Sequence, residues 1–416
     1  MDTERSLDAR SRGAGPLAGC LVADFSRVLA GPLATMILGD LGATVVKVEH
    51  PSGDDTRRWG PPFLAQESTY YLSVNRNKRS VVLDLATPEG RDGAVALAER
   101  ATVFVENFRP GRLAAFGLGY DQLATRNPGL VYCSISGFGG EGTPGAALAG
   151  YDFVIQAVSG LMDITGPEGG PPHKVGVAVV DVLTGLQAAI GVLAALAGRA
   201  ASGRGQRVEV SLFGSALAAL VNQASAYLNA GTVPRAMGNR HPSIAPYETL
   251  AAADGELAVA VGNNAQFSAL CATLGDASLA EDPRFRTNPD RVAHRQALVD
   301  ALEGLLARRG VADWVAALRD AGVPCGPVND VAAAFAEAER LGIRAAVPVP
   351  APPGPPGGSG GAGGSAGGGV TVTTVANPLG LSSTPVQYRR PPPALGQDTA
   401  EVLAWLADPD AGPLGP

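Results

Sequence analysis

The sequence is poor in the residues that build metal sites and disulfide frameworks. It has four cysteines and four histidines in 416 residues. The cysteines lie far apart, each among apolar neighbours, at Cys20, Cys133, Cys271 and Cys325. None shows CxxC or Cys/His ligand spacing, which excludes the usual zinc sites and a compact disulfide scaffold. We expect reduced thiols in folded cores and no metal.

Positive charge is also scarce. Lys and Arg number 32 against 39 Asp and Glu, for a net charge of −7 and a pI of about 5.2. This balance argues against a nucleic acid or an anionic membrane as partner. The first fifteen residues, MDTERSLDARSRGAG, lack the continuous apolar stretch of a signal peptide. We therefore expect a tail at the start of the chain and a cytoplasmic protein.

Apolar residues are plentiful, at 46% of the chain, and they fall into alternating short strands and helices. Helix starts follow the predicted strands at Gly31-Pro32 and at Thr87-Pro88-Glu89, with proline in the first turn. The predicted strands span 21–25, 44–49, 80–85, 102–106 and 130–136. Alternation of this kind predicts an α/β fold with a largely parallel sheet.

The chain changes character near residue 232. A smaller α+β segment is expected from there to residue 330, with a hairpin turn at Asp254-Gly255. Residues 351–369, APPGPPGGSGGAGGSAGGG, have no apolar face to pack, so we expect a disordered insertion there. The predicted organisation is a disordered tail (1–16), a large domain (17–231), a small domain (232–330) and a return to the large domain (331–416).

Two polar turns follow predicted strands, which is where open α/β sheets bind ligands. The first is SRVLAGP and the second is Asn107-Phe108-Arg109-Pro110-Gly111, which by itself is slightly more typical of an ordinary Pro-Gly turn. Glu49 ends the second strand as a ribose-binding acid would. The first turn lacks GxGxxG, however, so we do not predict a dinucleotide site.

One carboxylate, Asp181, stands between an apolar run (175–180) and a long Ala/Leu/Gly segment (182–198). A helix that is apolar all round is buried, and glycine, threonine and glutamine interrupt this one, so we expect a core helix and not a membrane span. Asp is a favoured N-cap residue, and from this stretch alone a cap is the favoured interpretation. A carboxylate at a buried helix start also suits acyl transfer through an enzyme anhydride.

Several segments together resemble the family III CoA-transferases of the CaiB/BaiF type. They are DFSRVLAGPLAT, GDLGATVVKVEHP, SVNRNKRSVVLDL, VENFRPG, GYDFVIQAVSGLM, GVAVVDVLTGLQ, GRGQRVEVSL and GVPCGPVND. Likeness to the succinate–hydroxymethylglutarate (succinyl-CoA:glutarate) branch rests on SVNRNKRS, GLMDITGPEG, SIAPYETL, VGNNAQF, NPDRVAHR and RRPPPALGQDT. The likeness extends from residue 17 to residue 406.

The resemblance implies a Rossmann-like large domain, a smaller α+β domain and an interlocked homodimer. It implies acyl-CoA as co-substrate, with no further cofactor, and identifies Asp181 as the catalytic carboxylate in place of a plain cap. The positions it matches to CoA contacts are Val28, Leu29, Ala30, His50, Asn107, Phe108 and Arg109. The formyl-CoA transferases carry a glutamine at the position of Leu29. They also carry a glycine-rich lid where this chain has GNRHPSIAPY (238–247). Formyl and oxalyl groups are therefore not the expected substrates.

In the implied chemistry Asp181 attacks a donor thioester, which the branch implies is succinyl-CoA, and CoA passes through an aspartyl-CoA thioester to a free acid. A dicarboxylate acceptor needs a cation for its second carboxylate, and arginine suits this because it pairs bidentately. We expect Arg76 and Arg291 in this role, although either is equally compatible with a surface or structural arginine. Tyr151 and His241 are also assigned to the substrate site, though a lone histidine is more often structural.

Two alternatives remain open from sequence. One is an α-methylacyl-CoA racemase of the same fold, but such enzymes carry a histidine at the position of Tyr151. The other is a CoA-binding protein without catalysis, for which an intact Asp181 would be a coincidence.

Overall fold

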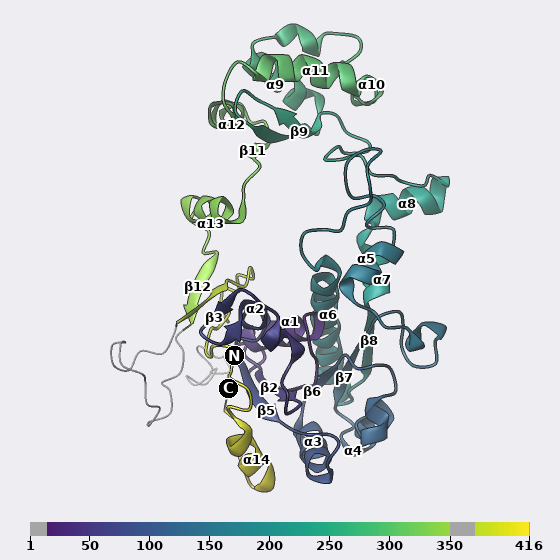
Figure 1. Cartoon of the computed structure of the whole chain (residues 1–416), viewed down its shortest axis with the longest axis vertical. Coiled ribbons are helices and arrows are strands. Elements are labelled where there is room, and N and C mark those ends of the chain that lie inside the picture. The colour runs from purple at the N-terminus through teal and green to yellow at the C-terminus, as the bar shows by residue number, and fades with distance from the viewer. Residues whose placement is uncertain (1–14, 350–370, 416) are drawn as a thin grey trace, which may run out of the picture. The chain divides into compact units, whose positions relative to one another are not determined.

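The computed structural model describes residues 15–349 and 371–415, which fold into two compact units (Figure 1). The smaller unit comprises 160–175 and 225–343, so it extends beyond the predicted 232–330 at both ends and includes a separate earlier segment. The remaining described residues form the larger unit. The predicted insertion at 351–369 lies outside the described residues, as do residues 1–14 of the predicted tail.

A six-stranded sheet forms the centre of the larger unit. Its strand order is β5-β2-β1-β6-β7-β8, and every neighbouring pair is parallel. The strands are β1 (Leu21–Asp24), β2 (Thr44–Glu49), β5 (Lys78–Val82), β6 (Val103–Glu106), β7 (Val131–Ser136) and β8 (Arg207–Ser211). The α/β fold with a mostly parallel sheet is thereby confirmed.

The third predicted strand, 80–85, is displaced from β5, which begins at Lys78. The prediction missed the start of β5 because charged residues such as Lys78 and Arg79 are not typical of a buried strand. Both are nevertheless buried, because each forms an ion pair. Lys78 Nζ lies 3.0 Å from Asp24 Oδ2, and Arg79 Nη1 lies 3.1 Å from Asp398 Oδ1.

Helices cover both faces of the sheet, as expected for parallel strands joined by crossovers. Thr87 caps the third helix, accepting a bond from Gly90 N, and proline occupies its first turn as predicted. The helices are α1 (Ala30–Asp40), α2 (Thr69–Val74), α3 (Pro88–Arg100), α4 (Tyr120–Arg126), α5 (Asp152–Val158), α6 (Val179–Ser202), α7 (Leu212–Ala219) and α14 (Thr399–Ala407). The boundary between the units crosses α8 (Val221–Ala230).

The long helix α6 is not buried all round, contrary to the sequence-based expectation. One face packs against α1, β7 and β8, with the Gly185 position against the carbonyl of Ala30. The opposite face leaves Leu186 42% and Ile190 65% exposed. Among the described helices α6 alone is long and apolar enough to cross a membrane. Its packed face, however, makes it a core helix of the α/β unit, as predicted.

Residues after the insertion return to the larger unit. Strand β12 (Ala346–Val349) pairs antiparallel with β13 (Val372–Val375). Arg76 joins this segment to α1: its guanidinium lies 2.5 Å from Asp40 Oδ2 and donates to Thr374 Oγ1 at 2.7 Å. Arg76 is 3% exposed. The prediction that Arg76 binds the acceptor is therefore wrong, because its guanidinium N–H groups donate to partners inside the fold.

The smaller unit packs helices on a three-stranded antiparallel sheet of order β11-β10-β9. The hairpin at Asp254-Gly255 is where predicted, since β9 (Tyr247–Ala251) and β10 (Glu256–Ala260) flank it. The other elements are α9 (Asn264–Leu274), α10 (Asn288–Ala293), α11 (Arg295–Leu306), α12 (Val311–Asp320), β11 (Cys325–Pro327) and α13 (Val331–Arg340).

Arg291 lies in the interior of the smaller unit with no exposed surface. It donates to the carbonyls of Ala245 at 2.7 Å and Phe285 at 2.9 Å, and to Asn264 Oδ1 at 3.1 Å. Its guanidinium also lies 4.5 Å from the centre of the Phe267 ring. The predicted acceptor contact is therefore wrong for Arg291 as well, because these groups consume its hydrogen-bonding capacity.

We predict that Arg76→Met lowers the free energy of unfolding by about 3–5 kcal/mol, because it leaves the buried Asp40 carboxylate without its cation. Urea denaturation measures this. Arg126→Met is the matched control: the Arg126–Glu99 pair is exposed, so its loss should cost less than about 1 kcal/mol. Equal losses for the two variants would contradict a structural role for Arg76.

Candidate active site

A cavity of about 280 Å³ opens in the larger unit at the carboxyl ends of β1 and β6. It is lined by the turn after β1, the turn after β6, the start of α6 and the residue before α5. The cavity brings together Val28, Leu29, Ala30, Asn107, Phe108, Arg109, Tyr151 and Asp181 from the sequence-predicted site. Segments far apart in the chain thus meet at one place, which we call the Asp181 pocket.

Asp181 lies in the first turn of α6 and does not cap it. The N-cap residue is Ala178, which supplies no side-chain bond. The cap comes from another helix, because Asp152 Oδ1 accepts from Val180 N at 2.8 Å and from Asp181 N at 3.3 Å. The interpretation of Asp181 as a plain cap is therefore wrong. The carboxylate of Asp181 is left free to face the pocket.

Asp152 is a site residue that sequence reasoning missed. It is buried in the first turn of α5, and Gln156 Nε2 donates to its Oδ2 at 2.6 Å. The two carboxylate oxygens of Asp152 thus have different partners: Oδ2 accepts from a residue of its own helix, and Oδ1 accepts from the start of α6. A signal existed in GYDF, where an acid opens a mostly apolar helix, but only the fold shows which helix the acid caps.

The environment of Asp181 disfavours the charged form of its carboxyl group. Burial and then the nearby charge of Asp152 raise the pKa of Asp181 to about 7. Burial also raises the pKa of Tyr70 to about 12, with the charge of Asp181 adding to it. A carboxylate with a pKa near 7 is more basic than an exposed one, as a poised nucleophile or base must be.

The two turns that line the pocket are bonded to each other. Asn107 Oδ1 accepts from Arg27 N at 2.9 Å, and Asn107 Nδ2 donates to Arg27 O at 2.7 Å. The side chain of Glu106 accepts from Phe108 N at 2.8 Å and also from the Ser134 hydroxyl. Asn107 therefore acts as a clamp between the turns, a role that the sequence does not reveal.

The start of α1 presents backbone groups to the same pocket. Its N-cap is Leu29, with no side-chain cap and no acid in the first turn, and both Leu29 and Ala30 line the pocket. Uncapped amides at a helix start carry partial positive charge and attract anions. Val28, one residue earlier, has a φ of 69°, a conformation that favours glycine.

Two arginines give the pocket positive charge. Arg27 and Arg109 both line it and both are exposed. The Arg27 guanidinium lies 5.2 Å from the centre of the Phe108 ring and 3.9 Å from Asp55 Oδ2. Their charge suits anionic groups of a ligand.

Two predicted residues do not line the Asp181 pocket. His50 is exposed, with Nδ1 2.8 Å from Ser52 Oγ, and is absent from the lining. His241 belongs to the smaller unit, where its Nδ1 accepts from Ser243 N at 3.1 Å and its ring lies 5.2 Å from that of Tyr247.

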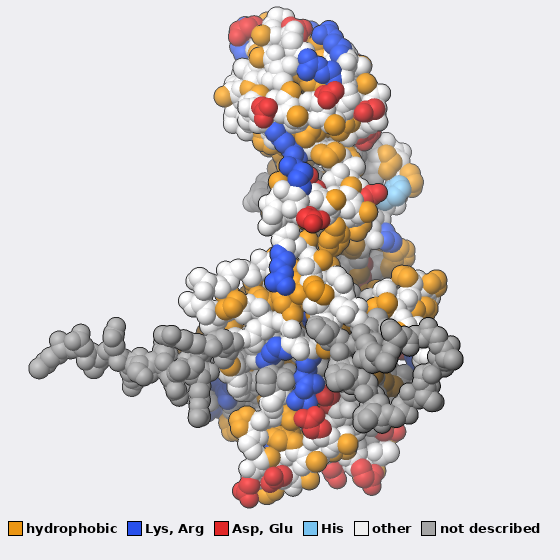
Figure 2. Space-filling view, turned by 90° about the vertical axis from the view of Figure 1, so that its left-hand side faces the viewer, with side chains coloured by type: hydrophobic (Ala, Val, Ile, Leu, Met, Phe, Trp, Pro, Cys, Tyr) orange, Lys and Arg blue, Asp and Glu red, His pale blue; other side chains and the backbone are white. Residues whose placement is uncertain are grey.

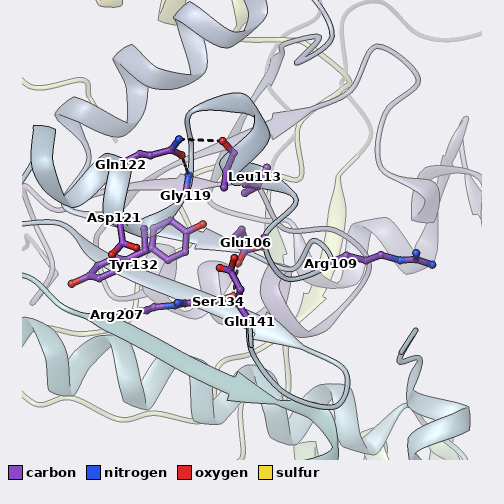
Figure 3. A pocket seen from close by; sticks show the side chains of 13 residues that line it. Glu106, Arg109, Leu113, Gly119, Asp121, Gln122, Tyr132, Ser134, Glu141 and Arg207 are labelled. Atoms are coloured by element: carbon purple, nitrogen blue, oxygen red, sulfur yellow. Dashed lines mark hydrogen bonds between the residues drawn. The ribbon is translucent and has the colours of Figure 1, made fainter. Parts of the chain in front are cut away.

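A second cavity of about 270 Å³ lies behind the turn after β6 (Figure 3). Burial raises the pKa of Glu106, which lines it, to about 7. Figure 3 shows Arg109, which lines both cavities, extending away from Glu106 and Tyr132. Asp181 is not part of this lining.

The surface in Figure 2 shows acidic, basic and apolar side chains mixed over the visible face.

Comparison with known proteins agrees with this architecture. Residues 17–399 match the sequence model of CoA-transferase family III. A succinate–glutarate CoA-transferase of Agrobacterium fabrum is 42% identical over 400 residues, covering 94% of this chain and 96% of that protein. An acetyl-CoA:oxalate CoA-transferase of Acetobacter aceti is 42% identical over 322 residues, covering 77% and 82%.

A solved structure gives the same result. The crystal structure of a CaiB/BaiF family protein from Brucella suis matches with a TM-score of 0.81 and 41% identity, covering 94% of this chain and all of that one. Sequence, fold and the turns around Asp181 lead to one conclusion. The chain belongs to CoA-transferase family III, and it is an enzyme of the CoA-transferase class.

Proposed function

We propose that this enzyme moves CoA from an acyl-CoA, with succinyl-CoA as donor, to a free dicarboxylic acid through covalent intermediates on Asp181. The observation that carries the proposal is the free carboxylate of Asp181 in the pocket, with its helix capped instead by Asp152. A carboxylate nucleophile retains the energy of the thioester because an anhydride and a thioester are both activated acyl groups.

The chemistry proceeds in four exchanges. Asp181 attacks the donor thioester carbonyl, which gives a mixed anhydride and releases CoA thiolate. The thiolate attacks the aspartyl carbonyl, giving an aspartyl-CoA thioester and free donor acid. The acceptor carboxylate attacks that thioester, which forms a new anhydride and again releases the thiolate. The thiolate then attacks the acceptor acyl carbonyl, and Asp181 is regenerated.

Each exchange places negative charge on a carbonyl oxygen, which backbone amides can stabilise. The start of α6 is the nearest helix start to Asp181. Two of its amides are already engaged, since Val180 N and Asp181 N are bonded to Asp152. The start of α1 lines the same pocket without a side-chain cap. We therefore assign the charge stabilisation to α1.

The acceptor class follows from the pocket's charge and from the relatives. Glutarate and oxalate, named in two relatives, are both dicarboxylic acids. With Arg76 and Arg291 confined to the interior, Arg27 and Arg109 are the arginines that line the pocket. We assign one to the far carboxylate of the acceptor and one to the phosphates of CoA.

A racemase has no support in this pocket. Such an enzyme needs a second proton carrier beside the aspartate. The residue at the matching position is Tyr151, which is 62% exposed, and none of the described residues that line the pocket is a histidine.

An interlocked cytoplasmic homodimer also forms part of the proposal. Apolar side chains exposed in the single chain support it: Ile190 on α6 and Leu228 on α8 are 65% and 77% exposed. Burying such groups against a second chain would remove apolar area from water. Light scattering should give twice the chain mass of 42.1 kDa.

We predict that Asp181→Asn folds with the wild-type circular dichroism and mass but loses transfer by roughly 1,000-fold or more, because the amide cannot form the anhydride. Transfer from succinyl-CoA to glutarate is measured by separating the CoA esters. Asp163→Asn, an exposed acid paired with Arg235, should retain wild-type turnover. Turnover by Asp181→Asn equal to the control would contradict the mechanism.

The pKa of Asp181 predicts the pH profile. Because the ionised form is the nucleophile, kcat/KM for succinyl-CoA should rise with pH to a plateau, with a midpoint near 7. Asp152→Asn removes the negative charge that adds to the rise, so its midpoint should move to lower pH. Asp163→Asn should not move it. A midpoint unchanged by Asp152→Asn would show that the two carboxylates do not interact.

We predict that dicarboxylates of four to six carbons are good acceptors and monocarboxylates of equal length poor ones. Changing the arginine that holds the far carboxylate to alanine, Arg27→Ala or Arg109→Ala, should lower the diacid preference by roughly 10- to 100-fold, since hydrogen bonds to charged groups are strong. A change at the CoA-binding arginine should instead raise KM for succinyl-CoA. Arg112→Ala, whose guanidinium lies 5.4 Å from the Phe116 ring centre and outside the pocket, is the control. An unchanged preference in both variants would overturn the assignment.

A further inference from the structure

The turn between β1 and α1 is held in an unfavourable conformation. Val28 has a φ of 69°, in the left-handed region where a β-branched side chain is a genuine outlier. Such residues persist only where surrounding contacts impose them, and they cluster at functional sites. Val28 lines the Asp181 pocket, so the strain lies at the proposed acyl-CoA site.

Side chains from two sides hold this turn. Asn107 exchanges two hydrogen bonds with the backbone of Arg27. Lys47 Nζ donates to the carbonyl of Ser26 at 2.9 Å. The Asp54 carboxylate accepts from Val28 N at 3.3 and 3.4 Å through its two oxygens. Lys47 and Asp54 therefore bond the backbone on either side of Arg27 without lining the pocket themselves.

Lys47 and Asp54 also form an ion pair, with 2.9 Å between Nζ and Oδ2 and no exposed surface on either side chain. Burial alone would lower the pKa of Lys47, yet Asp54 and neighbouring acids raise it above its ordinary value. Burial would raise the pKa of Asp54, and Lys47 lowers it. Both groups are therefore charged. A buried ion pair gives little net stability compared with apolar residues of similar size, so stability alone does not account for it.

We propose that the Lys47–Asp54 pair is a positioning device that holds the Val28 turn in its left-handed conformation and so shapes the acyl-CoA site. Asp54 offsets the cost of the strained φ through Val28 N, and Lys47 fixes both that carboxylate and the carbonyl of Ser26. The inference rests on the proposed function, because it takes the Asp181 pocket as the site of acyl-CoA.

The test is a double-mutant cycle between Asp54→Asn and Val28→Gly. Glycine adopts a positive φ without strain, so it removes the need for Asp54. We expect Asp54→Asn to lower CoA affinity, measured by calorimetry, and kcat/KM for succinyl-CoA by roughly 5- to 30-fold, the equivalent of left-handed strain in one residue. In the Val28→Gly background the same change should cost less than about 3-fold, since the strain is already relieved.

The matched control is Asp40→Asn. Asp40 is as buried as Asp54 and paired with a buried cation, Arg76, but its partners do not reach the turn. It should lower Tm and leave CoA affinity unchanged. If Asp54→Asn does not fold, Lys47→Met combined with Asp54→Asn leaves no unpaired buried charge and enters the same cycle.

Equal losses from Asp54→Asn in both backgrounds, or a fall in Tm with unchanged CoA affinity, would overturn the positioning role. These outcomes differ from a failure of the proposed function. In that case the wild-type protein itself would neither bind CoA nor transfer it.

Discussion

The contact on which the site depends is the pair of hydrogen bonds from the start of α6 to Asp152. A helix start leaves amides unpaired, and the nearest acid in the sequence would ordinarily satisfy them. Here a carboxylate from α5 does so, which leaves the acid in the first turn of α6 unengaged and facing the pocket. The same contact places two carboxylates close together, and their repulsion adds to the burial that raises the pKa of Asp181.

Around this carboxylate the pocket is formed mainly by the backbone of turns that hydrogen bonds hold in place, and few of its side chains are reactive. Parallel strands bring the turns after β1 and β6 to one edge of the sheet, and Asn107 joins them. Lys47 and Asp54, buried beneath the first turn, bond to its backbone without lining the pocket. Transfer through an anhydride requires such rigidity, because attacking and attacked atoms must be placed within contact distance while competing groups are kept away.

Much of the fold was predictable because its signals are local. Hydrophobic strands such as Thr44–Glu49 and a helix started by Thr87-Pro88 are visible in the sequence. The start of β5 was missed because Lys78 and Arg79 are charged, although ion pairs bury both. Arg76 and Arg291 were misassigned for the same reason. The sequence shows that an arginine is charged, but it does not show the buried partners, such as Asp40 for Arg76, that pair with it. Asp152 was missed because capping between helices is a tertiary contact.

The central claim is that Asp181 carries the acyl group and then CoA. The most direct measurement incubates the enzyme with succinyl-CoA alone, quenches with hydroxylamine, and locates the modified peptide by mass spectrometry. Because the first two exchanges need no acceptor, modification should appear without one, on the peptide that contains Asp181. An unmodified Asp181 peptide, with CoA transfer occurring only when donor and acceptor are bound together, would contradict the account.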